Sequence, residues 1–80
     1  MSKPAYPSPK ELEVLYAERD AAVAAMAAKG KIEAADLAPL DRLGRCKVAN
    51  EHWGICDESA RHSLLNDTHH FVRACACLAA

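Results

Sequence analysis

The chain has few large apolar side chains from which to build a core, because alanine accounts for 17 of its 80 residues. The apolar fraction of 51% includes these alanines and four cysteines, so it overstates the available core. A domain near this size buries only about 60% of the surface that its unfolded chain exposes. We therefore expect additional burial to come from a metal, disulfides, a second copy or a partner.

Charge and hydropathy narrow the class of protein. Ten Lys and Arg stand against 11 Asp and Glu, for a net charge of -1, and both signs occur along the whole chain. This balance lacks the basic stripe of nucleic-acid-binding proteins, so we expect no direct sequence-specific nucleic-acid binding. Without a membrane-length apolar run or an export signal, we predict a cytoplasmic chain with no membrane contact. We predict an extended arm over residues 1–7 and a single compact domain over residues 8–80.

Strong start and stop signals predict a long helix over residues 9–29. Ser8 is the expected N-cap, Pro9 takes the first helical position, and Glu11 completes a capping box. Gly30 suits the left-handed position that follows a helix.

This helix has two apolar faces at about 100° per residue. The face expected to meet the core consists of Leu12, Leu15, Tyr16, Ala22, Val23, Met26 and Ala27. The opposite face consists of Val14, Ala17, Ala21, Ala24, Ala25 and Ala28. Its alanines either serve helix propensity alone or pack closely against another helix, in this chain or in a partner.

The pattern changes period over residues 45–56, which predicts a β-hairpin. Cys46 and Val48, then Trp53 and Ile55, alternate with polar or small residues. Pairing Val48 with Trp53 would place all four side chains on one face. The expected core is therefore built by Leu12, Val23, Met26, Trp53, Leu64 and Phe71.

The flanking segments read as helical. Residues 32–43 predict a helical segment broken at Pro39, with Gly44 ending it. Residues 57–78 predict a second long helix with Asp57 near its N-cap. We thus predict an α+β fold, two long helices on a short antiparallel hairpin, with an all-α small bundle as the alternative.

The cysteines and histidines suggest a metal site, but their spacing disfavours it. The alternative ligand set for zinc or another metal is Cys46, Cys56, His70, Cys75 and Cys77. Zinc fingers and ribbons place cysteines two to four residues apart on a tight turn, and helical ligands lie three or four residues apart. The only cysteines this close are Cys75 and Cys77, and no His or Cys residues over 57–78 are three or four apart, so we favour no metal and no other cofactor. A site would require the helix to fray near its end. Structural disulfides are rare in the cytosol.

Thiol chemistry is a weaker alternative. Cys75 is expected in the core, whereas Cys77 is expected beside Arg73 and His70, where a lowered thiol pKa would make it reactive. A redox protein would use this thiol. A nucleophile also needs a base, an oxyanion site and a pocket, so we predict no enzyme and no catalytic residues.

The remaining hypothesis is a non-catalytic interaction protein, an inhibitor, adaptor or regulator that binds a larger protein or nucleoprotein complex, with a homodimer also possible. The candidate partner-binding residues are Arg42, Arg45, Lys47, His62, Asn66, His69, Arg73, Ala17, Ala21, Ala24 and Ala28. In size and in its lack of catalytic groups the chain resembles the small anti-restriction and anti-CRISPR inhibitors of phages and mobile elements. That likeness rests on no motif and assigns no residue.

Overall fold

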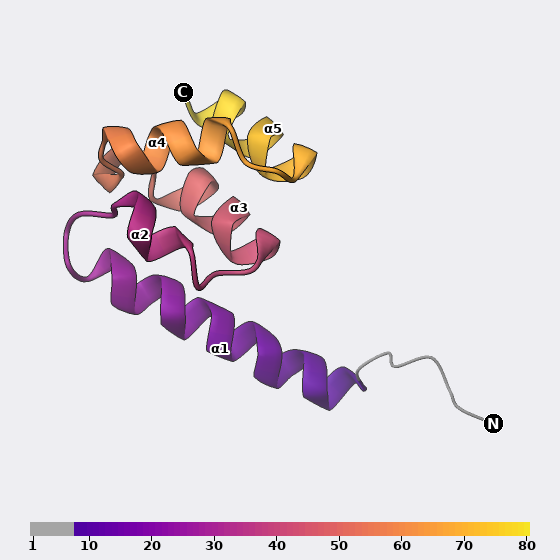
Figure 1. The fold of residues 1–80 in the computed structure, drawn as a ribbon. Helices are drawn as coiled ribbons and strands as arrows, with labels where there is room; N and C mark the ends of the chain where they lie inside the picture. Colours follow the sequence, from indigo (N-terminus) through magenta and orange to yellow (C-terminus); the bar gives the residue numbers. More distant parts are fainter. Residues whose placement is uncertain (1–7) are drawn as a thin grey trace.

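A computed structural model describes residues 8–80 as a bundle of short helices with one long helix along its side (Figure 1). The elements are α1 (Pro9–Ala27), α2 (Ala34–Leu37), α3 (Arg42–Glu51), the 3-10 helix η1 (Trp53–Ile55), α4 (Glu58–Leu65) and α5 (His70–Ala79). The predicted α+β fold is wrong, because the described residues contain no sheet, and the all-helical alternative is confirmed. The predicted arm over residues 1–7 lies outside the described residues.

Helix α1 begins and ends close to the predicted positions. The Ser8 hydroxyl accepts a hydrogen bond from the Glu11 backbone N–H at 3.2 Å, and Pro9 is the first helical residue. Gly30 has a φ of 79°, the left-handed conformation that glycine adopts without a steric penalty. These local signals need no tertiary contact to act, which explains why the sequence reports them correctly.

The predicted hairpin over residues 45–56 is wrong, since most of that segment belongs to α3. Asp41 begins this helix, and its carboxylate accepts a hydrogen bond from the Gly44 backbone N–H at 2.7 Å. Gly44 therefore lies inside a helix that it was expected to end. The alternation of Cys46 and Val48 is too short to separate strand from helix. Both side chains are buried on α3, together with Gly44 and Ala49.

The predicted helix over residues 57–78 is broken into α4 and α5. The Asn66 amide donates to the His62 carbonyl at 2.8 Å where α4 ends. The His69 imidazole Nδ1 accepts from the Phe71 backbone N–H at 3.2 Å where α5 begins. The Asp67 carboxylate accepts from the His69 backbone N–H between them. Polar side chains that bond to nearby backbone compete with a continuous helix, and they end it here.

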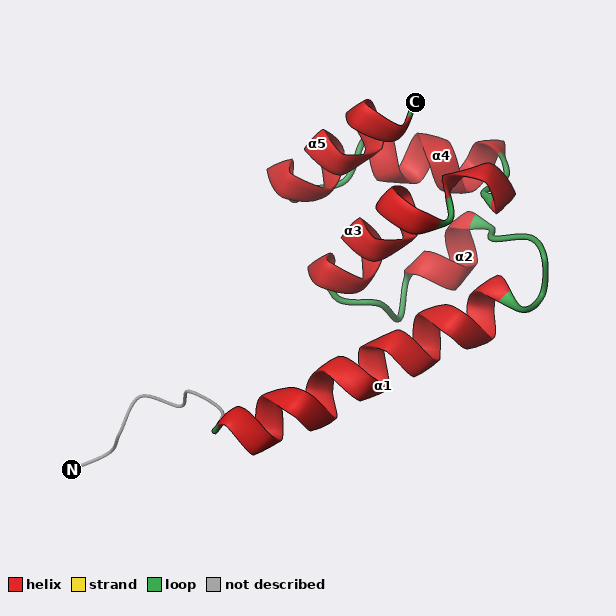
Figure 2. Ribbon diagram, turned by 180° about the vertical axis from the view of Figure 1, so that it is seen from behind, coloured by secondary structure: helices red, strands yellow, loops and turns green. Residues whose placement is uncertain are grey.

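Helix α3 lies between α1 and α5 in both views, and α4 packs on α5 and on α2 (Figures 1 and 2). The largest fully buried side chains are Ile32, Leu64, Val23, Val48 and Val72. The core predictions for Val23 and Leu64 are confirmed, whereas Phe71 is exposed. Trp53 packs at the edge of the core with Arg61 over its ring, 5.3 Å from the ring centroid.

One backbone bridge ties distant parts of the chain. The Ile32 N–H donates to the Ile55 carbonyl, and the Asp57 N–H donates to the Ile32 carbonyl, both at 2.9 Å. This parallel bridge between Ile32 and Cys56 joins the turn after α1 to the start of α4. In residues 8–80, the helices are all too short or too polar to cross a membrane.

Candidate functional site

Helix α1 packs on the rest of the molecule mainly through its carboxyl-terminal half. Val23 is its single buried residue. The Arg19 guanidinium lies 2.9 Å from the Asp41 carboxylate, and Asp20 lies 3.2 Å from the Lys47 ammonium. The amino-terminal half continues past the other helices (Figure 1). Its apolar side chains are only partly covered by this chain, since Leu15 borders an open depression with Pro39 and Leu40 and is 46% exposed.

Five large apolar side chains near this end of the molecule are exposed. Their exposed fractions are 53% for Val14, 46% for Leu15, 49% for Tyr16, 39% for Leu43 and 52% for Phe71. Single exposed apolar residues are ordinary, but several from different elements at one end indicate an interaction surface. The sequence assigned Leu15, Tyr16 and Phe71 to core-facing stripes.

The helix register brings three of these side chains toward one another. The Lys47–Asp20 ion pair joins α3 to α1. Leu43 lies one turn before Lys47 and Tyr16 lies one turn before Asp20, so both side chains lie on the amino-terminal side of this ion pair. Phe71 lies one turn before Cys75 on α5, whose thiol contacts that of Cys46. The three helices thus present Tyr16, Leu43 and Phe71 at the same end.

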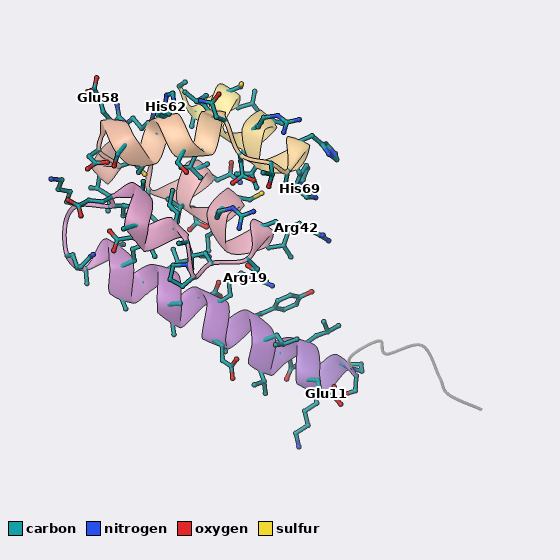
Figure 3. The ribbon with its side chains drawn as sticks, in the orientation of Figure 1. Glu11, Arg19, Arg42, Glu58, His62 and His69 are labelled. Carbon is teal, nitrogen blue, oxygen red and sulfur yellow. The ribbon has the colours of Figure 1, made fainter. Side chains whose placement is uncertain are left out.

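Positive charge accompanies this apolar group. Arg42 begins α3 and makes no salt bridge within the described residues. The pKa of His69 is lowered by loss of solvent and then by the positive charges of Arg42 and His70. Figure 3 shows Arg42 and His69 at the same end of the molecule. We call Tyr16, Leu43, Phe71, Arg42 and His69 the end surface.

Among the candidate residues, the basic trio Arg42, Arg45 and Lys47 does not act as one patch. Arg42 is exposed, but Arg45 donates to Asp67 at 2.6 Å and to the Leu40 carbonyl at 2.8 Å. Burial opposes ionisation of Asp67, yet hydrogen bonds from Arg45 and from the His69 backbone lower the pKa of that carboxyl. Arg45 thus joins α3 to the segment before α5 and is not free to bind a partner.

Lys47, the third member of the trio, contacts Asp20 at 3.2 Å and Glu51 at 3.1 Å. These two carboxylates on α1 and α3 neutralise its charge. Arg42 is therefore the only one of the three predicted cations free of a salt bridge in residues 8–80.

The four polar candidates of the predicted helix over residues 57–78 are divided between α4 and α5. His62 and Asn66 line an open depression along α4 with Ala34, Glu58, Ser59 and Ser63. Glu58 and His62 lie on α4, well away from the projecting tip of α1 (Figure 3). His69 caps α5, and Arg73 donates to the Asp67 carbonyl at 2.7 Å. The four candidates therefore do not form one binding face.

The predicted alanine candidates are all exposed along α1. Ala17, Ala21, Ala24 and Ala28 lie on the side of the helix opposite Val23. Their short side chains leave this side of the helix without protruding groups. Both interpretations of it, helix propensity alone and close packing against another helix, stay open.

Three of the four cysteines are packing residues. Cys46, Cys56 and Cys75 are buried, whereas Cys77 is exposed. Burial, followed by the hydrogen bond with Cys75, raises the pKa of Cys46 to about 11, and burial also raises the pKa of Cys56. Such thiols ionise rarely and are poor nucleophiles.

The alternative metal ligands are not assembled in the part of the chain that the structure describes. Within residues 8–80, no three His, Cys, Asp or Glu side chains lie close enough together to hold one ion. Cys46 lies against Cys75, while the Cys56 thiol donates to the His52 carbonyl at 3.4 Å.

Comparison with protein-family models, with curated proteins and with solved structures finds no match to this chain. The functional argument therefore rests on the site itself.

Proposed function

We propose that the chain is a small interaction protein that acts by binding another protein through its end surface. The observation that carries the proposal is the exposure of Tyr16, Leu43 and Phe71, on three different helices, beside Arg42, which makes no salt bridge within residues 8–80. A core this thin gains stability by placing such side chains on another apolar surface.

The composition of the end surface favours a protein partner. Aromatic residues and Arg are enriched among the residues that dominate binding energy at protein interfaces. Each buried aromatic ring removes a large apolar area from water, while Arg42 can form a charged hydrogen bond at the rim. A single free guanidinium gives little attraction to a nucleic-acid backbone, which usually engages several Lys and Arg.

The projecting half of α1 supports the same proposal. Leu15 and Tyr16 are neighbours on this helix, and both are about half exposed. The cap at Ser8 and the run of strong helix formers keep the half helix formed without tertiary contacts. A preformed helix loses little conformational entropy when it binds, so it is suited to docking.

The identity of the partner is a separate matter. The role as inhibitor, adaptor or regulator, including the anti-restriction or anti-CRISPR type, stays a prediction. Burial raises the pKa of the Cys46 and Cys56 thiols and so keeps them protonated, and the absence of catalysis stays a prediction.

Site-specific crosslinking in the cell that encodes the chain tests the proposal. A photo-crosslinking amino acid at position 43 should give a covalent protein adduct on irradiation. The same amino acid at position 62, on the exposed side of α4, is the matched control and should give far less. The absence of an adduct at position 43, or equal adducts at both positions, would contradict binding through the end surface.

A further inference from the structure

We infer that the occupant of the end surface is a second copy of this chain, which docks the amino-terminal half of its α1 there. This inference rests on the proposed function, because it names the partner of the same surface. The inference follows from two features at one end of the molecule that are complementary in charge and shape.

The first feature is an acidic edge on α1. Glu11, Leu15 and Glu18 follow one another at spacings of four and three residues, so they share one side of the helix. Both carboxylates are exposed and make no salt bridge within residues 8–80. Leu15, between them, is 46% exposed. Glu11 lies near the projecting tip of the helix (Figure 3).

The second feature is the end surface, which has the opposite charge. Its apolar members Leu43 and Phe71 are exposed, and its ionisable members Arg42 and His69 carry positive charge or none. Of the nearby acids, Asp41 pairs with Arg19 and Asp67 pairs with Arg45, whereas Glu13, one turn before Tyr16 on α1, makes no salt bridge within residues 8–80. An acidic apolar helix therefore meets apolar area together with unpaired positive charge.

The acidic edge and the end surface together permit a closed dimer. The acidic edge and the end surface adjoin the same helix, so a two-fold axis near the middle of α1 can place each edge on the other end surface. The contact is then isologous and self-limiting, as in most homodimers. It covers Leu15, Leu43 and Phe71 in both copies at once, which adds the burial that the chain itself lacks.

Self-association of charge-reversed chains tests this pairing. Sedimentation equilibrium of the full chain should show a dimer that weakens with added salt. Arg42→Glu and Glu18→Lys should each weaken dimerisation at least about tenfold, because each sets like charges opposite one another. Mixing the two variants restores opposite charges at both contacts, so a heterodimer should form from two monomeric chains.

Matched controls separate this pairing from a change in net charge or folding. Glu58→Lys alters the net charge as Glu18→Lys does, but on α4, and should leave the dimer unchanged. Leu15→Ser should weaken dimerisation with the helical circular dichroism preserved, since Leu15 is not part of the buried core. A wild-type chain that is monomeric at about 1 mM, a range in which even weak specific pairs form, would overturn the inference. A dimer that the charge variants leave intact, or a mixture that stays monomeric, would also overturn it.

The mass of the crosslinked adduct at position 43 distinguishes this inference from the proposed function. An adduct of twice the chain mass supports the second copy. An adduct to a different protein overturns the second copy but keeps binding through the end surface. No adduct overturns both.

Discussion

Helices α1 and α5 differ in what stabilises them. Helix α1 has 19 residues and buries only Val23, whereas α5 has 10 residues and buries Val72, Cys75 and Ala76. The longer helix is stabilised mainly by its cap and by alanine, and the shorter one by packing. The comparison shows that a helix can be well specified by its sequence and still have little to do with the core.

Because they differ in burial, the two helices have separate roles in stability and in binding. Helix α5 completes the body with α3 and α4, and its contacts cannot be altered without loss of stability. Helix α1 keeps half of its length free, so substitutions there should change binding while leaving the fold intact. The following predictions test this division, beginning with the largest expected effect.

Arg45→Ala should destabilise the body by about 3 kcal/mol, because it leaves the Asp67 carboxylate, whose side chain is 7% exposed, without its guanidinium partner. Arg42→Ala, on the same helix but without a salt bridge in the described residues, should change stability by less than about 0.5 kcal/mol. Urea unfolding measures both. Equal effects would mean that the Arg45–Asp67 pair does not fix α5.

Val72→Ala on α5 should cost about 2 kcal/mol, since Val72 is fully buried and its loss leaves a cavity. Leu15→Ala on α1 removes more apolar volume but should cost less than about 0.5 kcal/mol in the monomer, because Leu15 is half exposed. Thermal unfolding at low protein concentration compares the two. A larger cost at Leu15 would show that α1 packs more fully than described.

Ala21→Gly on the exposed side of α1 should reduce the stability of α1 against local unfolding by about 1 kcal/mol through helix propensity alone. The effect should stay local, with faster amide exchange over the amino-terminal half of α1 and unchanged exchange over α5. Ala21→Ser, a weaker perturbation of propensity, provides the graded control. Faster exchange throughout the body would contradict the separation of α1 from the core.

Arg19→Gln should have the smallest effect, about 0.5 kcal/mol at neutral pH, because the Arg19–Asp41 pair is partly exposed. The Arg19 hydrogen bond lowers the pKa of Asp41 below its unfolded value. Its contribution is thus complete above the unfolded pKa and disappears as the pH falls through the lowered one. The free energy of unfolding of the wild-type chain and of Arg19→Gln should be measured from neutral pH to pH about 2. The difference between the two should vanish in acid. A difference that grows in acid would contradict this role for Asp41.

The fold was predictable from sequence where the signal was local. Ser8, Pro9 and Gly30 act through backbone geometry and hydrogen bonds within a few residues, so they located α1 correctly. The segment of Cys46 and Val48 was ambiguous because its apolar residues fit both a strand and a helix over so short a length. The break at Asn66 depends on several side-chain hydrogen bonds acting together, which periodicity does not register.

The candidate site was predictable only in part. Arg42 and His69 were selected as polar candidates, but Tyr16 and Phe71 were assigned to core-facing stripes. Periodicity identifies which residues share a side of a helix, and it cannot say whether a neighbouring helix extends far enough to cover that side. The exposure of Phe71 depends on how α5 is placed on α3 and α4, which only the assembled structure provides.

The Ile32–Cys56 bridge has a consequence for how the chain would respond to a protease. It closes α2, α3 and η1 into a loop whose two ends are held by paired backbone. A cut at the exposed Pro39 would therefore leave fragments that stay associated, through the bridge and through the Arg19–Asp41 and Asp20–Lys47 ion pairs. Nicked molecules should migrate as one species under native conditions and separate only when denatured.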